Sequence, residues 1–349
     1  MGTTPPETDL PELVSTLYAR ATAEMKRLIP LYLALAERTG NFSRVTEADV
    51  QDEDSRRLLL SGIASDLDPS RATAAQAVQE WERRQAVPFD TETSITTGVY
   101  LNLRRYAESL YDSLHVDTEG FTRFEAAVIV CKPYYLPLLQ HLGGLFSKAQ
   151  LKRQIGSVSD AMISAPAGQR LADYLAARVD PTRVEKREIL GRLDSTLEGI
   201  VRDLVGRVLL ESVVAHALEG EKLPFVREED YESLAGVVYD FRADFVLPNA
   251  ETPKVFIEVR KSSTRHASLY AKDKMFSAIN WKGRHKDLLG VLVVDGPWTG
   301  STLVVMAKVF DYVVPLGRAA DLAKTIKTYL EGDRSKLKWL IEFRIAENR

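Results

Sequence analysis

The sequence predicts an α/β or α+β fold in its second half and a mostly helical first half. In residues 9–40 and 70–86, apolar residues recur at intervals of three and four, which is typical of amphipathic helices, and Ser70 is expected to cap the second one. Further along, a long helical segment at 193–221 precedes a series of short apolar runs. Helices that bracket four or five short strands favour a sheet covered by helices.

Each expected strand has a run of apolar residues bounded by polar or turn-forming residues. The expected strands span residues 237–247, 255–259, 289–295, 303–306 and 309–315. A closing helix is expected to begin near Arg318. The second half therefore has the elements of a compact working domain.

The chain length suggests more than one hydrophobic core. With 349 residues, the chain exceeds the size at which a single core usually stops growing. The residue pattern changes near 177–188, and the small-residue stretch 156–167 is expected to be a loop. We therefore expect two domains, a mostly helical region at 1–190 and a mixed domain at 191–349.

Composition indicates an ordinary globular protein of the cytoplasm. A single cysteine, Cys131, excludes an intramolecular disulfide and a cysteine-cluster zinc site, and suits a reducing compartment. The N-terminal residues lack the basic and apolar regions of a secretory signal. The apolar run 124–146 is interrupted by charges and prolines, so we expect buried core helices there and no membrane association.

Positive charge is concentrated in one part of an otherwise acidic chain. Residues 1–94 carry 10 Lys/Arg and 16 Asp/Glu, a balance of −6, whereas residues 260–286 carry eight Lys/Arg and one Asp, a balance of +7. Aromatic residues alternate with these charges. This pattern is typical of a surface that contacts a nucleic-acid backbone, although a solvated helix face would give the same charges.

Acidic residues also occur in the predicted helix and in the first predicted strand of the second half. Glu211 falls within the apolar stripe of the helix at 193–221, so its carboxylate would be buried against the sheet. Alternatively, its side chain reaches out at the edge of the stripe or pairs with a neighbouring arginine. In the run 237–247, period-two alternation puts Asp240, Arg242 and Asp244 on one face, as a solvent-facing strand would also do.

The next strand carries a glutamate between apolar neighbours. Alternation puts Phe256, Glu258 and Arg260 on one face, and the short preceding turn predicts an antiparallel hairpin that brings Asp244 beside Glu258. Adjacent carboxylates repel each other unless a cation lies between them. Mg²⁺ prefers such oxygen ligands, and as a Lewis acid it can activate water for phosphodiester hydrolysis.

The stretch 242–263, RADFVLPNAETPKVFIEVRKSS, resembles the core of the PD-(D/E)XK nuclease superfamily. The resemblance implies a central mixed sheet flanked by helices. It also implies that Asp244 and Glu258 bind Mg²⁺, and that Glu211 assists them or holds a second metal ion. Ala243 stands where the family often has proline.

The sequence departs from the family pattern at the catalytic lysine, because Arg260 occupies that position. Arginine stabilises negative charge but is a poor general base. Three alternatives are open: Arg260 acts electrostatically, a β-bulge turns Lys261 inward, or Lys272 or Lys274 from the following helix supplies the ammonium group.

Within the superfamily, a chain of this size with an added helical region is similar to type II restriction endonucleases. The resemblance implies an Mg²⁺-dependent endonuclease acting on double-stranded DNA, with a companion DNA methyltransferase that forms no stable complex with it. A symmetric target site favours a homodimer. The helical region would serve DNA recognition or dimerisation.

The charged stretch supplies the expected DNA contacts. They are Arg265, Lys272, Lys274, Trp281, Lys282, Arg284 and Lys286. Two other functions remain open: a repair or recombination nuclease acting on structured DNA, and a DNA-binding protein that has kept the fold but lost the activity.

Overall fold

The computed structural model describes residues 16–87, 89–156, 158–262 and 267–342 and divides the chain into two compact units. The units are Met1–Val205 and Gly206–Arg349. The expected boundary near residue 190 lies before the division. The sequence carries no break at the observed position because the helical pattern continues across it.

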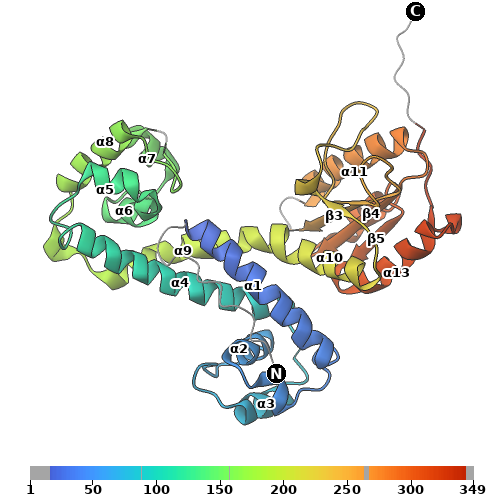
Figure 1. Ribbon diagram of the computed structural model, residues 1–349, viewed down its shortest axis with the longest axis horizontal. Coiled ribbons are helices and arrows are strands. Elements are labelled where there is room, and N and C mark those ends of the chain that lie inside the picture. The colour runs from blue at the N-terminus through green and yellow to red at the C-terminus, as the bar shows by residue number, and fades with distance from the viewer. Residues whose placement is uncertain (1–15, 88, 157, 263–266, 343–349) are drawn as a thin grey trace, which may run out of the picture. The chain divides into compact units, whose positions relative to one another are not determined.

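The first unit is built from packed helices (Figure 1). They are α1 (Leu17–Arg38), α2 (Glu53–Gly62), α3 (Ala74–Arg83), α4 (Thr91–Asp117), α5 (Ala126–Cys131), α6 (Leu136–Leu142), α7 (Lys148–Ile155), α8 (Ala165–Ala176) and α9 (Lys186–Leu204). Helices α1, α4 and α9 pack against one another, and α5 packs against α8. The N-cap of α3 is Thr73, which forms a capping box with Gln76, so the expectation of a cap at Ser70 is wrong.

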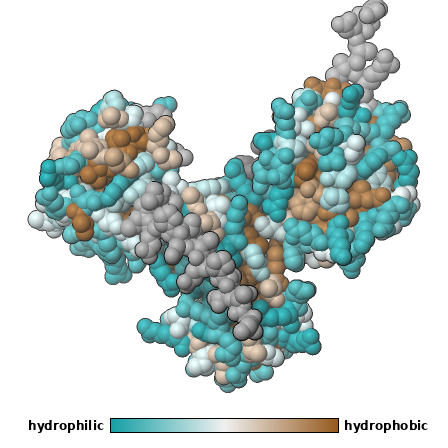
Figure 2. Space-filling model, viewed as in Figure 1, coloured by the Kyte–Doolittle hydropathy of each residue, from teal (hydrophilic) through white to brown (hydrophobic). Residues whose placement is uncertain are grey.

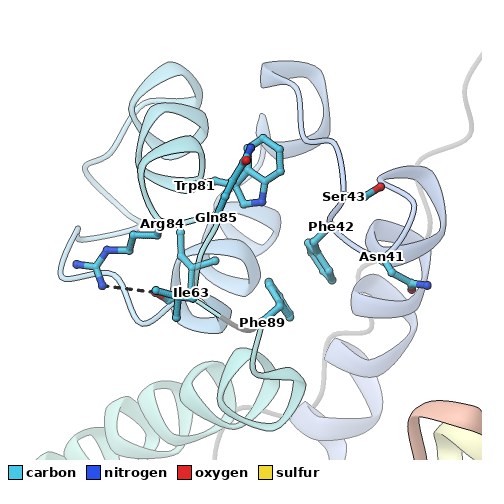
Figure 3. A pocket seen from close by; sticks show the side chains of 9 residues that line it. Asn41, Phe42, Ser43, Ile63, Trp81, Arg84, Gln85 and Phe89 are labelled. Atoms are coloured by element: carbon cyan, nitrogen blue, oxygen red, sulfur yellow. Dashed lines mark hydrogen bonds between the residues drawn. The ribbon is translucent and has the colours of Figure 1, made fainter.

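Aromatic side chains surround a pocket of about 350 Å³ in the first unit (Figure 3). The rings of Phe42 and Phe89 stack with their centroids 3.7 Å apart, and Trp81 lies on the opposite side of the pocket. The pocket's charged side chain, Arg84, is already engaged by Glu80 and by the main-chain oxygen of Ala64. The Arg84 guanidinium therefore links the end of α3 to the segment that follows α2.

The second unit contains a mixed five-stranded sheet, in agreement with the predicted fold class. Its elements are α10 (Leu210–Gly220), β1 (Val226–Arg227), β2 (Phe245–Leu247), β3 (Val255–Lys261), α11 (Ala267–Arg284), β4 (Leu289–Asp295), α12 (Gly300–Met306), β5 (Tyr312–Pro315) and α13 (Ala319–Leu330). The strand order is β1-β2-β3-β4-β5; the first three strands are antiparallel neighbours, and β3, β4 and β5 run parallel. Helix α11 covers one side of the sheet, and α10 and α13 lie on the other (Figure 1).

The predicted long helix at 193–221 is interrupted. Its two parts, α9 and α10, are joined by a π-helical turn at Val205–Leu209, where the division between the units falls. The hydrophobic period of the sequence continues through this turn, so the residue pattern does not reveal the interruption.

Three predicted strands differ from the structure. Of the run 309–315, only Tyr312–Pro315 forms β5. The run 303–306 belongs to helix α12, whose first turn is capped by the Thr299 side chain, because a four-residue apolar run suits a buried helix as well as a strand. Of the run 237–247, only the last three residues form β2. The Asn280 side chain binds the Val238 N–H and the Tyr239 oxygen, which occupies main-chain groups that a longer strand would need.

The described helices include none that is both long enough and apolar enough to cross a bilayer. Hydrophilic residues dominate the face seen in Figure 2, and hydrophobic areas are scattered among them. The apolar run 124–146 contributes to the buried core through residues such as Ile129, Leu138 and Leu139, as expected.

A buried ion pair ties the end of α11 to the sheet of the second unit. The Lys282 Nζ atom lies 2.5 Å from Asp311 Oδ2, and the two side chains are 1% and 0% exposed. Asp311 also accepts hydrogen bonds from the main-chain N–H groups of Gly290, Lys338 and Trp339. This carboxylate therefore joins four segments of the chain.

Replacing Lys282 with methionine should lower the free energy of unfolding by about 3–5 kcal/mol, because Asp311 would keep a buried charge without its ammonium partner. Urea unfolding of the full-length chain measures the change. Lys286→Met removes an exposed lysine nearby and should change the free energy by less than about 0.5 kcal/mol. Equal stability of the two variants would show that the buried pair does not stabilise the second unit.

Candidate functional site

The β2–β3 hairpin brings two acidic side chains together. In the antiparallel register Phe245 lies opposite Ile257, and one further step places Asp244 opposite Glu258. The Asp244 Oδ2 atom accepts a hydrogen bond of 2.6 Å from the main-chain N–H of Val259. Both residues are deeply buried, with exposed fractions of 3% for Asp244 and 0% for Glu258.

Two cations lie against this buried pair of carboxylates. Arg260 bridges them: its Nη1 atom is 3.1 Å from Asp244 Oδ2, and its Nη2 atom is 3.0 Å from Glu258 Oε2. From α11, the Lys274 Nζ atom lies 2.9 Å from the same Glu258 oxygen. The two cations offset the two negative charges.

Burial shapes the protonation of this cluster. Desolvation raises the pKa of Glu258, and the neighbouring Asp244 charge raises it further, while Arg260 and Lys274 act in the opposite direction. Burial acts to lower the pKa of Arg260, but the surrounding carboxylates prevail and raise it. The guanidinium therefore stays charged.

Oxygen atoms converge on the end of the Arg260 side chain. Its Nη1 atom lies 3.1 Å and 3.4 Å from the two carboxylate oxygens of Asp244 and 2.8 Å from the main-chain oxygen of Val259. The Glu258 Oε1 atom is buried and has no hydrogen-bond partner among the described residues. With Glu258 Oε2, which lies 3.0 Å from Nη2, four oxygens contact the guanidinium of Arg260.

Glu211 lies near the acidic pair at the start of α10. Burial and the charge of Asp244 raise its pKa to about 8, and Arg260 partly opposes this shift. In the part of the chain that the structure describes, no three His, Cys, Asp or Glu side chains form a group that could hold a metal ion. Glu211 therefore influences the pair electrostatically without completing a set of three acidic ligands.

The structure distinguishes between the candidate lysines. Strand β3 pairs with β4 residue by residue from Val255 to Lys261, without an inserted residue over these described positions. The bulge that would turn Lys261 towards the carboxylates is therefore not observed. Lys272 is exposed on α11, whereas Lys274 contacts Glu258 directly.

Two of the expected DNA contacts are wrong. Trp281 and Lys282 are 0% and 1% exposed and face the core, so they cannot contact a phosphate backbone. The Trp281 ring packs against Phe256, with the centroids 5.0 Å apart. The charge count of the sequence carries no information about which side of α11 each residue occupies, and these two lie on the inner side.

Two of the other expected DNA contacts lie far along the chain from Lys274. Arg284 and Lys286 are exposed, but a helix rises about 1.5 Å per residue, which places Arg284 about 15 Å along α11 from Lys274. Arg265 lies outside the described residues. The described basic residues are therefore divided: Lys274 contacts the Asp244–Glu258 pair, Lys282 lies in the core, and Arg284 and Lys286 lie exposed at the far end of the helix.

No residue pattern indicates that Tyr231 lies beside this site. Its hydroxyl donates a hydrogen bond of 2.8 Å to the Ala243 oxygen and accepts one of 2.5 Å from the Ala243 N–H, next to Asp244. Burial raises its pKa, and the charges of Glu258 and Asp244 add to this effect. Tyr231 fixes the main chain that precedes β2, and its place outside any regular element explains why periodicity does not identify it.

No family model, curated protein or solved structure matches this chain. The residues and geometry of the acidic site are therefore the basis for a functional assignment.

The pKa of Glu211 predicts a pH dependence of stability in the absence of metal ions. The folded-state pKa of about 8 exceeds the ordinary value of 4.5, so the folded chain holds this proton more tightly than the unfolded chain. The free energy of unfolding should therefore decrease as the pH rises from about 4.5 to about 8. Glu211→Gln has no proton to lose at this position, and the decrease should become smaller.

Urea unfolding in EDTA at pH 5.5 and pH 8.5 measures this difference. Glu219→Gln, an exposed change on the same helix, should keep the wild-type pH dependence. If Glu211→Gln and the wild type lose the same stability between the two pH values, Glu211 is not protonated in the folded state.

Proposed function

We propose that this protein is an Mg²⁺-dependent endonuclease that hydrolyses phosphodiester bonds in double-stranded DNA. The observation that carries the proposal is the convergence of Asp244, Glu258 and the Val259 oxygen on one position of positive charge. Acids from neighbouring antiparallel strands, with a third acid on the preceding helix, are also what the resemblance to PD-(D/E)XK nucleases implies.

The donor atoms fit a hard divalent cation. Asp244 and Glu258 would hold Mg²⁺, which prefers carboxylate and carbonyl oxygens and keeps several water ligands. The unpartnered Oε1 atom of Glu258 offers a further oxygen. When bound, the ion supplies Lewis acidity and lowers the pKa of a coordinated water.

The side chains around the acids have distinct roles in this proposal. Lys274 presents its ammonium group beside Glu258 and would orient the attacking water or stabilise charge on the phosphate. Arg260 would stabilise the same developing negative charge, since it remains protonated. Glu211, with a pKa of about 8, can exchange a proton near neutral pH at the edge of the site.

The proposed substrate is DNA, and the proposed enzyme class is a type II restriction endonuclease. Exposed Lys272, two residues before Lys274 on α11, would contact the phosphate backbone. The affinity for DNA would therefore decrease as the salt concentration rises. A palindromic target would be cut by a homodimer, and a companion methyltransferase would protect the host DNA.

One observation favours a second candidate, a DNA-binding protein without catalysis. Arg260 already neutralises part of the acidic charge without a metal ion, by bridging Asp244 and Glu258. A chain in which this bridge never opens would bind DNA and leave it intact.

Incubation of the purified chain with plasmid DNA, in Mg²⁺ or in EDTA, tests the proposed function. Discrete fragments that form only in Mg²⁺ indicate a restriction enzyme. Cleavage confined to branched DNA indicates a repair nuclease, and a mobility shift without cleavage indicates binding alone.

Asp244→Asn and Glu258→Gln should each lower the cleavage rate by more than about 100-fold, because losing even an outer partner of a metal site costs 10–100-fold. DNA binding in a mobility-shift assay should be largely preserved. Glu251→Gln, an exposed change in the turn between β2 and β3, is the matched control and should cut at the wild-type rate. Wild-type cleavage by either site variant would show that the catalytic acids lie elsewhere.

A further inference from the structure

We infer that Arg260 is a competing cation built into the acidic site, which a divalent metal ion must displace in order to bind. The inference rests on the proposed function, because it concerns the same oxygen atoms. It goes further by assigning Arg260 a second role, in which its guanidinium limits the affinity of the site for metal ions.

The position of the guanidinium supports this role. Nη1 is 2.8–3.4 Å from three oxygens, those of the Asp244 carboxylate and the Val259 main chain. Mg²⁺ binds oxygen at about 2.0–2.1 Å, so an ion shared by these atoms would need the space that Nη1 fills. The guanidinium and the ion therefore exclude each other.

The charges explain why the guanidinium occupies this space in the absence of metal. Asp244 and Glu258 are buried side by side, and two such carboxylates cannot both remain ionised without a nearby cation. Arginine presents a planar fork of donors that can bridge two carboxylates at once. Arg260 thus performs the charge neutralisation that a metal ion would otherwise provide.

Exposure indicates which partner can move. The Arg260 side chain is 27% exposed, whereas the side chains of Asp244 and Glu258 are 5% and 0% exposed. The Glu258 carboxylate is carried by strand β3 and the Asp244 carboxylate is bound to the Val259 N–H, whereas the guanidinium has access to solvent. Displacement of Arg260 therefore requires a change of side-chain rotamer and leaves the hairpin intact.

Lys274 provides a matched comparison. Its ammonium group also pairs with Glu258, at 2.9 Å, but no contact joins it to the Asp244 carboxylate or the Val259 oxygen among the described interactions. Removing Lys274 takes away a nearby positive charge without emptying the space between the oxygens. Removing Arg260 does both.

Binding of Mn²⁺ in the absence of DNA tests the inference, with free Mn²⁺ measured by electron paramagnetic resonance. Arg260→Met should bind Mn²⁺ at least about tenfold more tightly than the wild type, a difference of about 1.4 kcal/mol. Lys274→Met should show a smaller gain. Asp244→Asn combined with Arg260→Met should lose the gain, which assigns the bound ion to this site.

Arg260→Lys provides a second test of the competition in case Arg260→Met does not fold. It keeps a positive charge but lacks the fork that bridges two carboxylates, so its Mn²⁺ affinity should lie between those of the wild type and Arg260→Met. Circular dichroism checks that each variant is folded. If Arg260→Met does not fold, tighter Mn²⁺ binding by Arg260→Lys than by the wild type still supports competition, and equal binding by these two proteins overturns it.

The contrary results are distinguishable. Arg260 variants that bind Mn²⁺ no more tightly than the wild type would overturn the competition and leave the proposed nuclease standing. An equal gain in Arg260→Met and Lys274→Met would also overturn it, since general electrostatics would then explain both. If neither the wild type nor any folded variant binds Mn²⁺, the proposed metal-dependent function itself fails.

Discussion

The burial of two carboxylates side by side is the constraint on which the second unit depends. Asp244 directly precedes β2 and Glu258 lies in β3, and both are buried where water cannot solvate their charges. A cation must therefore accompany them, and Arg260 and Lys274 fill this need. The same constraint explains the raised pKa values of Glu258 and Glu211.

Helix α11 supplies lysines that neutralise two buried acids of the second unit. Lys274 and Lys282 are separated by eight residues, close to two helical turns, and both reach towards the sheet. Lys274 pairs with Glu258 in the candidate site, and Lys282 pairs with Asp311 in the core. Part of the positive charge in the stretch 260–286 thus neutralises buried acids within the unit. Lys274 therefore lies at the candidate site, whereas Lys282 belongs to the core.

The sequence predicted the features that depend on local pattern. Alternation and a short turn were enough to predict strand β3 and the hairpin that brings Asp244 beside Glu258, and a continuous apolar run was enough to predict strand β4 but not its direction. It could not predict that Lys282 would be buried, because the partner Asp311 lies 29 residues away in the chain. The shortened β2 has a similar cause, since Asn280 binds the preceding main chain from a distant helix. These errors arise where tertiary contacts override local preference.

The proposed nuclease and the displacement of Arg260 both require that the oxygens around Arg260 form a site for one divalent cation. Crystals of the full-length chain soaked in Mn²⁺ test it directly through anomalous scattering. We expect a peak at about metal–oxygen bonding distance from both Asp244 and Glu258, with the Arg260 side chain turned away. An Arg260 bridge that persists without a peak, at Mn²⁺ concentrations that saturate the protein in solution, would contradict it.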